Sequence, residues 1–256
     1  MGDILKQKLE KHYLAFNKTK ISPDPLQFLH NFKKPEDIEL VGLISSTFAY
    51  GNVKQINNTL EKIFNILGSH PNNNLLRMNK REIFKNFEGI KHRFYTNDDV
   101  KKFFTVLNKI LLKEGSIKNI FLKYYDENDD NVKQIINYFS THMLKQFNDV
   151  SPGIKFMFPM PEKGSACKRI NLFLRWMVRE DELDFGLWKE IKKNQLLIPV
   201  DTHISRICQK LKLTSKKNVS WNMAEEITNN LKKFDIEDPV KYDFAICHIG
   251  MRKMEF

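Results

Sequence analysis

Apolar residues recur every three or four positions along most of this chain, the spacing that lines one face of an α-helix. Residues 52–67 show it most clearly, with Ile56, Leu60, Ile63, Phe64 and Leu67 on one side of a helical wheel. The same spacing predicts helices over 3–17, about 35–48, two or three within 98–124 and 131–147, then 165–179, 184–193, 199–213, 220–233 and 239–251. Alternating runs typical of strands are scarce, so we expect an all-α protein.

Helix-breaking residues interrupt this pattern in few places. The chain has 10 Gly and 9 Pro, and it contains no internal repeat or low-complexity tract. The most turn-rich stretch is 148–164, and it divides two groups of expected helices. We therefore expect a single all-α domain in two lobes. Lobe A comprises about 1–50 plus 200–256, and lobe B comprises about 51–199, including the turn-rich region 152–168.

The charge balance favours a polyanionic partner. Lys and Arg number 42 against 31 Asp and Glu, a formal net charge of +11, and the sequence pI is about 9.4. A positive surface binds phosphates with release of counterions, so nucleic acid is the expected partner. A chain rich in Asn, Lys and Ile can also acquire this excess through base composition, in which case the protein is a helical scaffold that binds another protein.

Several classes of protein are excluded. No apolar run approaches the length of a membrane-spanning helix, and the first residues lack the layout of a signal peptide. The cysteines, Cys167, Cys208 and Cys247, have no paired spacing, which argues against a zinc site, an iron–sulfur cluster or a disulfide framework. We expect a cytoplasmic, nucleoid-associated monomer with reduced thiols, no metal and no cofactor.

The segment from Ile198 to Leu213 carries the most informative acid. Asp201 follows an extended X-Pro-Val step and stands where a helix begins, so its carboxylate is expected to cap the first turn. Ile204, Ile207, Cys208 and Leu211 form the apolar face of that helix. From the residues alone, Asp201 is a helix cap and nothing more.

A resemblance adds a second role for Asp201. The stretch VDTHISRICQKLKL resembles the signature of the helix-hairpin-helix, Gly/Pro…Asp superfamily of DNA glycosylases, in which the Asp of this motif is the essential carboxylate. Two more segments resemble the family in the expected order, Glu39–Phe48 and Tyr242–Gly250. Roughly residues 20–250 are closer still to a bacterial branch known only as a domain of unknown function.

The chain also departs from the superfamily pattern. Phe158-Pro-Met-Pro-Glu-Lys-Gly-Ser-Ala-Cys-Lys168 stands in place of the usual hairpin. Thr47, or else Phe48, occupies the position of the Gln that commonly enters the DNA stack. The missing cysteine set excludes the iron–sulfur subgroup. The resemblance implies a two-lobed, glycosylase-like fold with a helix-hairpin-helix element.

The resemblance also implies a candidate nucleophile. Bifunctional members use a Lys in or after the hairpin that forms a Schiff base with the sugar. Lys168 lies 33 residues before Asp201, a spacing similar to that of archaeal 8-oxoguanine DNA glycosylases. Lys168 is therefore our candidate, with two alternatives: an anchor for a DNA phosphate, or a lysine that is merely on the surface.

The residues around Lys168 suggest a DNA contact. Lys168, Asn171, Arg175 and Arg179 share one face of the expected helix, and Arg169 adds a further cation. The N–H groups of Gly164 and Ser165 are expected to cradle a phosphate. Most stripes of this kind are only solvated basic faces, so that interpretation stays open.

Other residues complete the candidate site. Arg206 is expected to meet either a phosphate or a carboxylate, and His203 to brace the start of the Asp201 helix. Thr47, Phe48, Tyr50, Phe158 and Trp176, with Phe156, are candidates for a base pocket or wedge, although aromatic residues more often belong to the core.

These observations predict an enzyme that acts on lesion-containing double-stranded DNA. It flips out and excises a damaged base, an oxidised purine being one candidate, with or without apurinic/apyrimidinic lyase activity. Asp201 stabilises the positive charge that develops on the sugar, and Lys168 is the nucleophile. The alternative is a non-catalytic helix-hairpin-helix protein that binds damaged or branched DNA.

Overall fold

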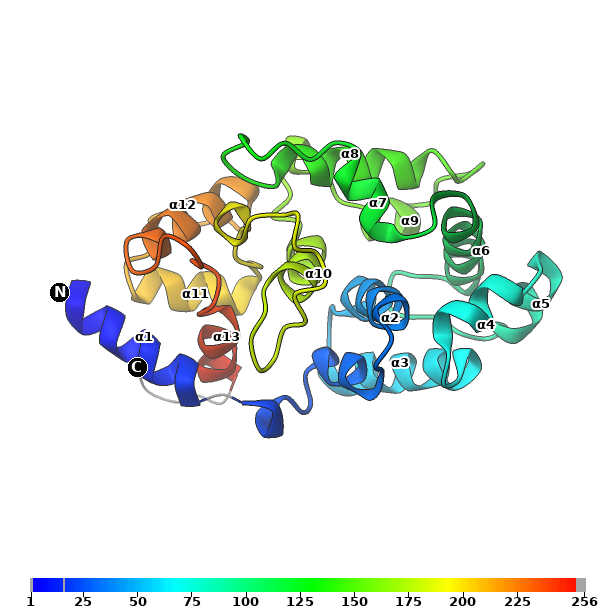
Figure 1. Ribbon diagram of the computed structural model, residues 1–256, viewed down its shortest axis with the longest axis horizontal. Coiled ribbons are helices and arrows are strands. Elements are labelled where there is room, and N and C mark those ends of the chain that lie inside the picture. The colour runs from blue at the N-terminus through cyan, green and yellow to red at the C-terminus, as the bar shows by residue number, and fades with distance from the viewer. Residues whose placement is uncertain (1, 16, 252–256) are drawn as a thin grey trace. The chain divides into compact units, whose positions relative to one another are not determined.

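The computed structural model describes residues 2–15 and 17–251, and every regular element in this part of the chain is a helix (Figure 1). The only β pairing among these residues is two isolated bridges, His92 with Tyr95 and Glu180 with Phe185. The all-α prediction is confirmed. The helices form two compact units, which do not follow one another along the sequence.

Unit 1 consists of the N-terminal segment to Ile21, Asp126–Lys133 and the chain from Met160 onward. Its α-helices are α1 (Gly2–Ala15), α10 (Lys168–Val178), α11 (Thr202–Lys210), α12 (Trp221–Lys232) and α13 (Asp243–Met251). Short 3₁₀ turns join them, η1 (Lys18–Lys20), η3 (Pro161–Lys163) and η4 (Lys193–Gln195). Helix α13 packs against both α1 and α11.

Unit 2 consists of Ser22–Tyr125 and Gln134–Pro159. Its elements are η2 (Pro25–Asn31), α2 (Pro35–Phe48), α3 (Val53–Leu67), α4 (Pro71–Arg77), α5 (Lys80–Asn86), α6 (Asn97–Glu114), α7 (Ile117–Leu122), α8 (Lys133–Leu144) and α9 (Pro152–Met157). Two buried acids of α2 fix its neighbours. Asp37 accepts the backbone N–H of Asn72 at the start of α4, and Glu39 accepts that of Ile117 at the start of α7.

The boundaries of the units differ from those of the expected lobes. Residues 22–50 lie in unit 2, because η2 packs on α2, which in turn packs on α3 and α4. Residues 160–199 lie in unit 1, where ion pairs join α10 to the C-terminal region. The region 152–168 is divided between the units, with α9 in unit 2 and α10 in unit 1. The helix-hairpin-helix element therefore stays a prediction.

Most expected helices are present, with one wrong and three missed. The helix expected over 184–193 is absent: Phe185 and Trp188 instead donate backbone N–H groups to the last turns of α10. The missed helices are α4, α5 and α9. Pro71 and Pro152 occupy the first turns of α4 and α9, where a proline fits because its missing N–H would have no helical partner. Treating prolines only as breakers concealed both helices.

Candidate functional site

Asp201 caps helix α11, as the sequence predicts. Its backbone is extended, and its Oδ1 accepts the N–H groups of His203 at 2.8 Å and Ile204 at 3.0 Å. Ile204 and Cys208 are buried below it and fix the helix in unit 1. The carboxylate thus lies at the positive end of the α11 dipole, which favours its ionised form.

Lys168 meets the other oxygen of the same carboxylate. It is the first residue of α10, and its Nζ lies 2.9 Å from Oδ2 of Asp201. The two side chains are 31% and 24% exposed, so the pair is neither sealed in the core nor fully solvated. The structure therefore places the predicted nucleophile and the predicted carboxylate in direct contact at the starts of two helices.

The surroundings of Asp201 keep it ionised. Burial alone would raise the pKa of this carboxyl, but the Lys168 ammonium and the two backbone N–H groups outweigh it and hold the pKa below its usual range. At neutral pH Asp201 is therefore a carboxylate that points one oxygen at an amine. This arrangement can stabilise a cation that forms next to it.

The turn before Lys168 is tightly specified. Cys167 precedes the helix with φ +46°, a left-handed conformation that side chains rarely adopt, and its N–H is accepted by Ser165 Oγ. Burial raises the pKa of the Cys167 thiol to about 12, so this cysteine is not a nucleophile at neutral pH. Asn171 donates from Nδ2 to the Ala166 carbonyl and closes the turn on the first residues of α10.

The prediction that the N–H groups of Gly164 and Ser165 cradle a phosphate is wrong for Gly164. The N–H of Gly164 donates to the Pro161 carbonyl at 2.8 Å, so it is occupied within its own turn. Gly164 also has φ +78°, which is why a glycine suits this position. The role of Ser165 stays a prediction.

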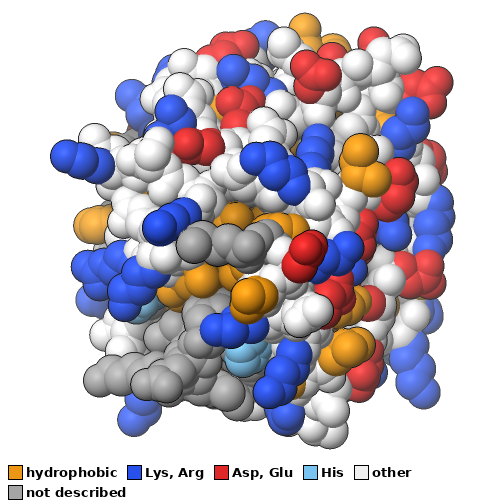
Figure 2. Space-filling view, turned by 90° about the vertical axis from the view of Figure 1, so that its left-hand side faces the viewer, with side chains coloured by type: hydrophobic (Ala, Val, Ile, Leu, Met, Phe, Trp, Pro, Cys, Tyr) orange, Lys and Arg blue, Asp and Glu red, His pale blue; other side chains and the backbone are white. Residues whose placement is uncertain are grey.

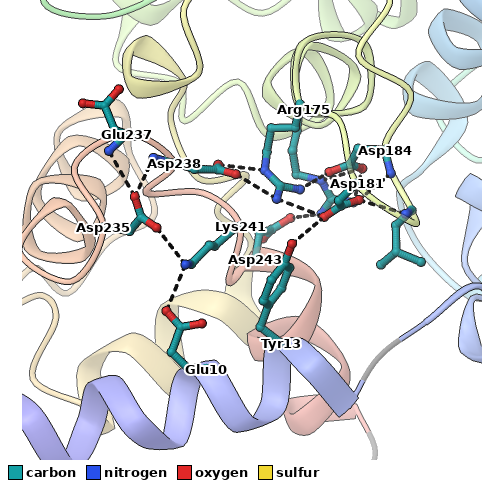
Figure 3. A network of polar contacts seen from close by, with 12 residues as sticks. Glu10, Tyr13, Arg175, Asp181, Asp184, Asp235, Glu237, Asp238, Lys241 and Asp243 are labelled. Atoms are coloured by element: carbon teal, nitrogen blue, oxygen red, sulfur yellow. Dashed lines mark hydrogen bonds and ion pairs between the residues drawn. The ribbon is translucent and has the colours of Figure 1, made fainter.

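The prediction that the arginines after Lys168 form a DNA-facing basic stripe is wrong. Arg169, Arg175 and Arg179 are 6%, 3% and 2% exposed, so none of them presents its side chain to DNA. Arg175 donates to Asp184 from two nitrogens, at 3.1 and 3.3 Å, and to Asp243 from a third (Figure 3). Helical spacing puts Arg175 on the same face as Lys168, whereas Arg179 lies just after the end of α10. The spacing does not reveal that buried carboxylates cover these arginines.

Arg179 lies at the centre of a second set of carboxylates. Its guanidinium contacts Asp238 at 2.8 and 3.0 Å, Asp181 at 3.0 Å, and the second oxygen of Asp184. Tyr13 of α1 also donates to Asp181, at 3.1 Å. The planar guanidinium fork suits several such contacts at once, so the two arginines join α1, α10 and the C-terminal region into one unit.

The network holds more carboxylates than arginines, since Arg175 and Arg179 face four aspartates. Complete burial raises the pKa of Asp243 to about 6, although Arg175 opposes this shift. Asp243 is also affected electrostatically by Lys168 and Asp201. The buried network and the exposed ion pair are therefore linked through charge.

A third ion-pair group attaches α1 to the turn just before α13. Lys241 lies 2.7 Å from Asp235 and 2.9 Å from Glu10 (Figure 3). Tyr242 donates to the same glutamate. These side chains were not singled out in the sequence, because their partners are far apart along the chain. The face shown in Figure 2 carries Asp and Glu as well as Lys and Arg, so the positive charge is not gathered there in one unbroken patch.

Two of the remaining polar candidates stay open to solvent. Arg206 and His203 are exposed on α11, one turn and half a turn beyond Asp201. Arg206 has no ion pair with any carboxylate in the part of the chain that the structure describes. It is therefore placed where a phosphate could reach it, and this role stays a prediction.

The prediction of a base pocket or wedge is wrong for the four candidates that are buried. Thr47, Phe48, Phe158 and Trp176 are 4%, 0%, 2% and 0% exposed and belong to the cores of their units. Tyr50 is half-buried, and it packs with Phe156, which is 39% exposed. The end of α2 is thus a core element, and the exposed aromatic side chains lie beyond it.

The described residues offer neither a metal-ligand cluster nor a membrane-spanning helix. Within residues 2–15 and 17–251, no three His, Cys, Asp or Glu side chains are arranged to hold a metal ion. No described helix is long and apolar enough to cross a membrane.

The fold and the site define an all-helical protein with a Lys–Asp ion pair where two of its helices begin. The profile of a family described as a protein of unknown function, DUF2400, matches residues 24–252, and the chain belongs to this family. Neither the curated proteins nor the solved structures give a significant match.

Proposed function

We propose that this protein is a DNA repair glycosylase that flips a damaged base out of the duplex and excises it. The observation that supports the proposal is the contact between Lys168 and Asp201. The resemblance to helix-hairpin-helix glycosylases assigned these residues complementary roles, although 33 positions separate them. The spacing shared with archaeal 8-oxoguanine glycosylases points to an oxidised purine as the base.

The chemistry follows from the two side chains. Cleavage of an N-glycosidic bond leaves positive charge on the sugar, and the Asp201 carboxylate stabilises that charge. For a bifunctional reaction, Lys168 first passes a proton to solvent water, and its Nζ then bonds to C1′ while the C1′–N bond breaks. The base departs with the bonding electron pair and takes up a proton. Opening of the sugar ring gives a Schiff base, from which the 3′ phosphate is eliminated.

The ion pair between Lys168 and Asp201 must open before Lys168 can attack the sugar. Only a neutral amine attacks, so the substrate must separate Lys168 from Asp201 and leave the lysine without its proton. The partial exposure of both side chains allows a sugar to enter between them. In a monofunctional reaction Lys168 stays charged, and Asp201 positions a water in its place.

Borohydride trapping tests the proposal. Wild-type protein is incubated with duplexes that carry single oxidised purines, other lesions or an abasic site, and a Schiff base is reduced to a stable adduct. We expect an adduct that Lys168→Gln abolishes and that Asp201→Asn lowers at least about 100-fold. Lys163→Gln is the matched control, because Lys163 is an exposed lysine of the preceding turn.

Each outcome separates the possibilities. Base release that depends on Asp201 without trapping identifies a monofunctional glycosylase. Trapping that survives in Lys168→Gln assigns the nucleophile to another amine. If no duplex is cut or trapped while DNA still binds, the glycosylase proposal fails and a non-catalytic DNA-binding protein replaces it.

A further inference from the structure

Unit 2 exposes a cluster of aromatic side chains beside an arginine. Phe94 is 60% exposed and Phe156 is 39% exposed, and their rings meet edge to face at 5.5 Å. Tyr50 lies against both, nearly parallel to Phe94 at 6.1 Å and edge to face with Phe156 at 5.0 Å. Three separate segments of unit 2 thus bring their aromatic rings to one place on the surface.

Arg93 completes this group, which we call the aromatic platform: Tyr50, Arg93, Phe94 and Phe156. The guanidinium carbon of Arg93 lies 5.7 Å from the centre of the Tyr50 ring and 5.5 Å from that of Phe94. Arg93 is exposed and has no ion pair with a carboxylate in the described residues. A cation over aromatic faces is a favourable arrangement that also suits stacking on a flat ligand.

The platform is held rigidly from below. The Tyr50 hydroxyl donates to the His92 carbonyl at 2.6 Å and accepts the N–H of Phe94 at 3.2 Å. The bridge between His92 and Tyr95 closes the turn that presents Arg93, whose φ is +49°. Gly51 has φ +97°, and a Cβ there would collide with the Arg93 side chain. The exposed rings are therefore presented by a fixed turn rather than by a loose loop.

The exposed charges of the segments that form the platform have a single sign. The segments 49–56, 90–97 and 151–158 that form it contain no Asp or Glu. Their cations are all exposed: Lys54, Lys91, Arg93 and Lys155. Among the nearby acids, Asp98 and Asp149 both pair with Lys102. Asp99 is buried beneath the platform segments and accepts hydrogen bonds from Thr96 and Ser151. Aromatic faces between unpaired cations match a ligand with flat rings on an anionic backbone.

A second exposed aromatic pair in unit 2 provides a contrast. Tyr124 and Tyr138 stack at 4.0 Å and are 43% and 46% exposed. Tyr124 is followed along the chain by Asp126, Glu127, Asp129 and Asp130, so its sequence surroundings are acidic. Exposed rings alone therefore do not define the platform. Phe94 and Phe156 have unpaired cations beside them, whereas Tyr124 and Tyr138, among the described residues, do not.

We propose that the aromatic platform of unit 2 stacks an unpaired base of a nucleic-acid strand, with the surrounding lysines on the neighbouring phosphates. This proposal rests on the proposed function only in sharing DNA as the ligand. It does not involve Lys168 or Asp201, and it requires no bond to be broken. Its ligand class is single-stranded or locally unpaired nucleic acid.

The test uses the full chain and a short single-stranded oligodeoxynucleotide with one 2-aminopurine, whose fluorescence falls when it stacks on an aromatic ring. Wild-type protein should bind the strand and quench the probe, and should bind the same sequence less tightly as a fully paired duplex. Phe94→Ala should weaken binding roughly 5- to 150-fold and abolish the quenching. Phe94→Trp should retain both, because it keeps a ring at this position.

Two further variants separate stacking from charge. Arg93→Lys keeps the charge but loses the flat guanidinium, so it should reduce quenching more than it changes the dependence of binding on salt. Lys91→Gln should lower the salt slope by about 0.7 and leave the quenching intact. Tyr138→Ala is the matched control, an exposed aromatic of the same unit, and it should change neither.

The outcomes distinguish this proposal from the proposed function. If Phe94→Ala binds and quenches like the wild type, the platform proposal fails, whatever the trapping experiment gives. If the wild type binds the strand and quenches the probe but releases no base from any lesion-containing duplex, the platform stands and the glycosylase proposal fails. A Phe94→Ala effect seen only on self-association would assign the platform to a second copy of the chain and overturn the proposal.

Discussion

Helix α10 carries cations at both ends, and the two ends differ in almost every physical respect. Lys168 in the first turn is 31% exposed and meets one carboxylate, that of Asp201. Arg175 and Arg179 in and after the last turn are 3% exposed and share four carboxylates. The same helix therefore begins at a reachable ion pair and ends in a buried network.

The difference separates charges that hold the fold from charges that can act on a ligand. A buried ion is stable only while its partners are present, so every member of the network is committed to structure. A half-exposed pair in contact with water contributes little to stability and can be opened by a substrate. Of the cations on α10, Lys168 alone meets the second condition.

Asp184→Asn should have the largest effect on stability, because this carboxylate joins Arg175 to Arg179. Removing one partner of a buried ion pair costs about 3–5 kcal/mol, a large part of the 5–15 kcal/mol that holds a domain together. Urea denaturation measures the loss. Lys189→Gln, which removes an exposed ion pair with Glu180 from the same loop, should change stability by less than about 1 kcal/mol. Equal effects of the two variants would mean that burial does not distinguish these pairs.

Asp243→Asn should alter how stability depends on pH. In the folded protein the pKa of Asp243 is raised to about 6, so the native state binds more protons than the unfolded state between about pH 4 and 6. Through this group, stability falls as the pH rises across that window, by up to about 1.4 kcal/mol per pH unit. The Asn variant lacks this loss, so its stability relative to the wild type should increase from pH 4 to 7.

Asp201→Asn is the control of opposite sign. The pKa of Asp201 is lowered in the folded state, so its contribution is present above about pH 4 and is lost as the pH falls below it. The destabilisation caused by this variant should therefore shrink in acid. A flat difference for Asp243→Asn from pH 4 to 7 would contradict the assignment of a proton to the network.

The sequence predicts the helices well because apolar spacing reports directly on which face is buried. It also predicts the cap at Asp201, since an Asp after an extended Pro-Val step has a local partner in the first turn of α11. The contact of Lys168 with Asp201 is different. No spacing rule brings together residues 33 positions apart, and only the family resemblance indicated it.

The wrong predictions for the arginines and the aromatic side chains share one physical cause, which is that burial in the folded unit leaves no local signal in the sequence. Two of the carboxylates that bury Arg175 and Arg179, those of Asp243 and Asp238, lie 68 and 59 residues away along the chain. The other two, Asp181 and Asp184, are close in sequence, but helical spacing does not show that their loop folds back onto the arginines. The aromatic platform was predicted only in part: Tyr50 and Phe156 were candidates for stacking on a base, whereas Arg93 and Phe94 were not. Phe94 lies in a short polar turn with no apolar period, so its exposure becomes visible only in the folded unit.

Lys168→Gln should have the smallest effect on stability and yet a complete effect on trapping. The lost ion pair is partly exposed, so the free energy of unfolding should fall by less than about 1 kcal/mol. Asp201→Ala should cost about 1–2 kcal/mol, because it also removes the cap of α11. Urea denaturation at neutral pH measures both. A loss above about 2 kcal/mol for Lys168→Gln would make the pair a structural clamp and remove the contrast between the two ends of α10. A small loss would show that the fold positions Lys168 without depending on it for stability. This is the behaviour expected of a residue that acts in a reaction.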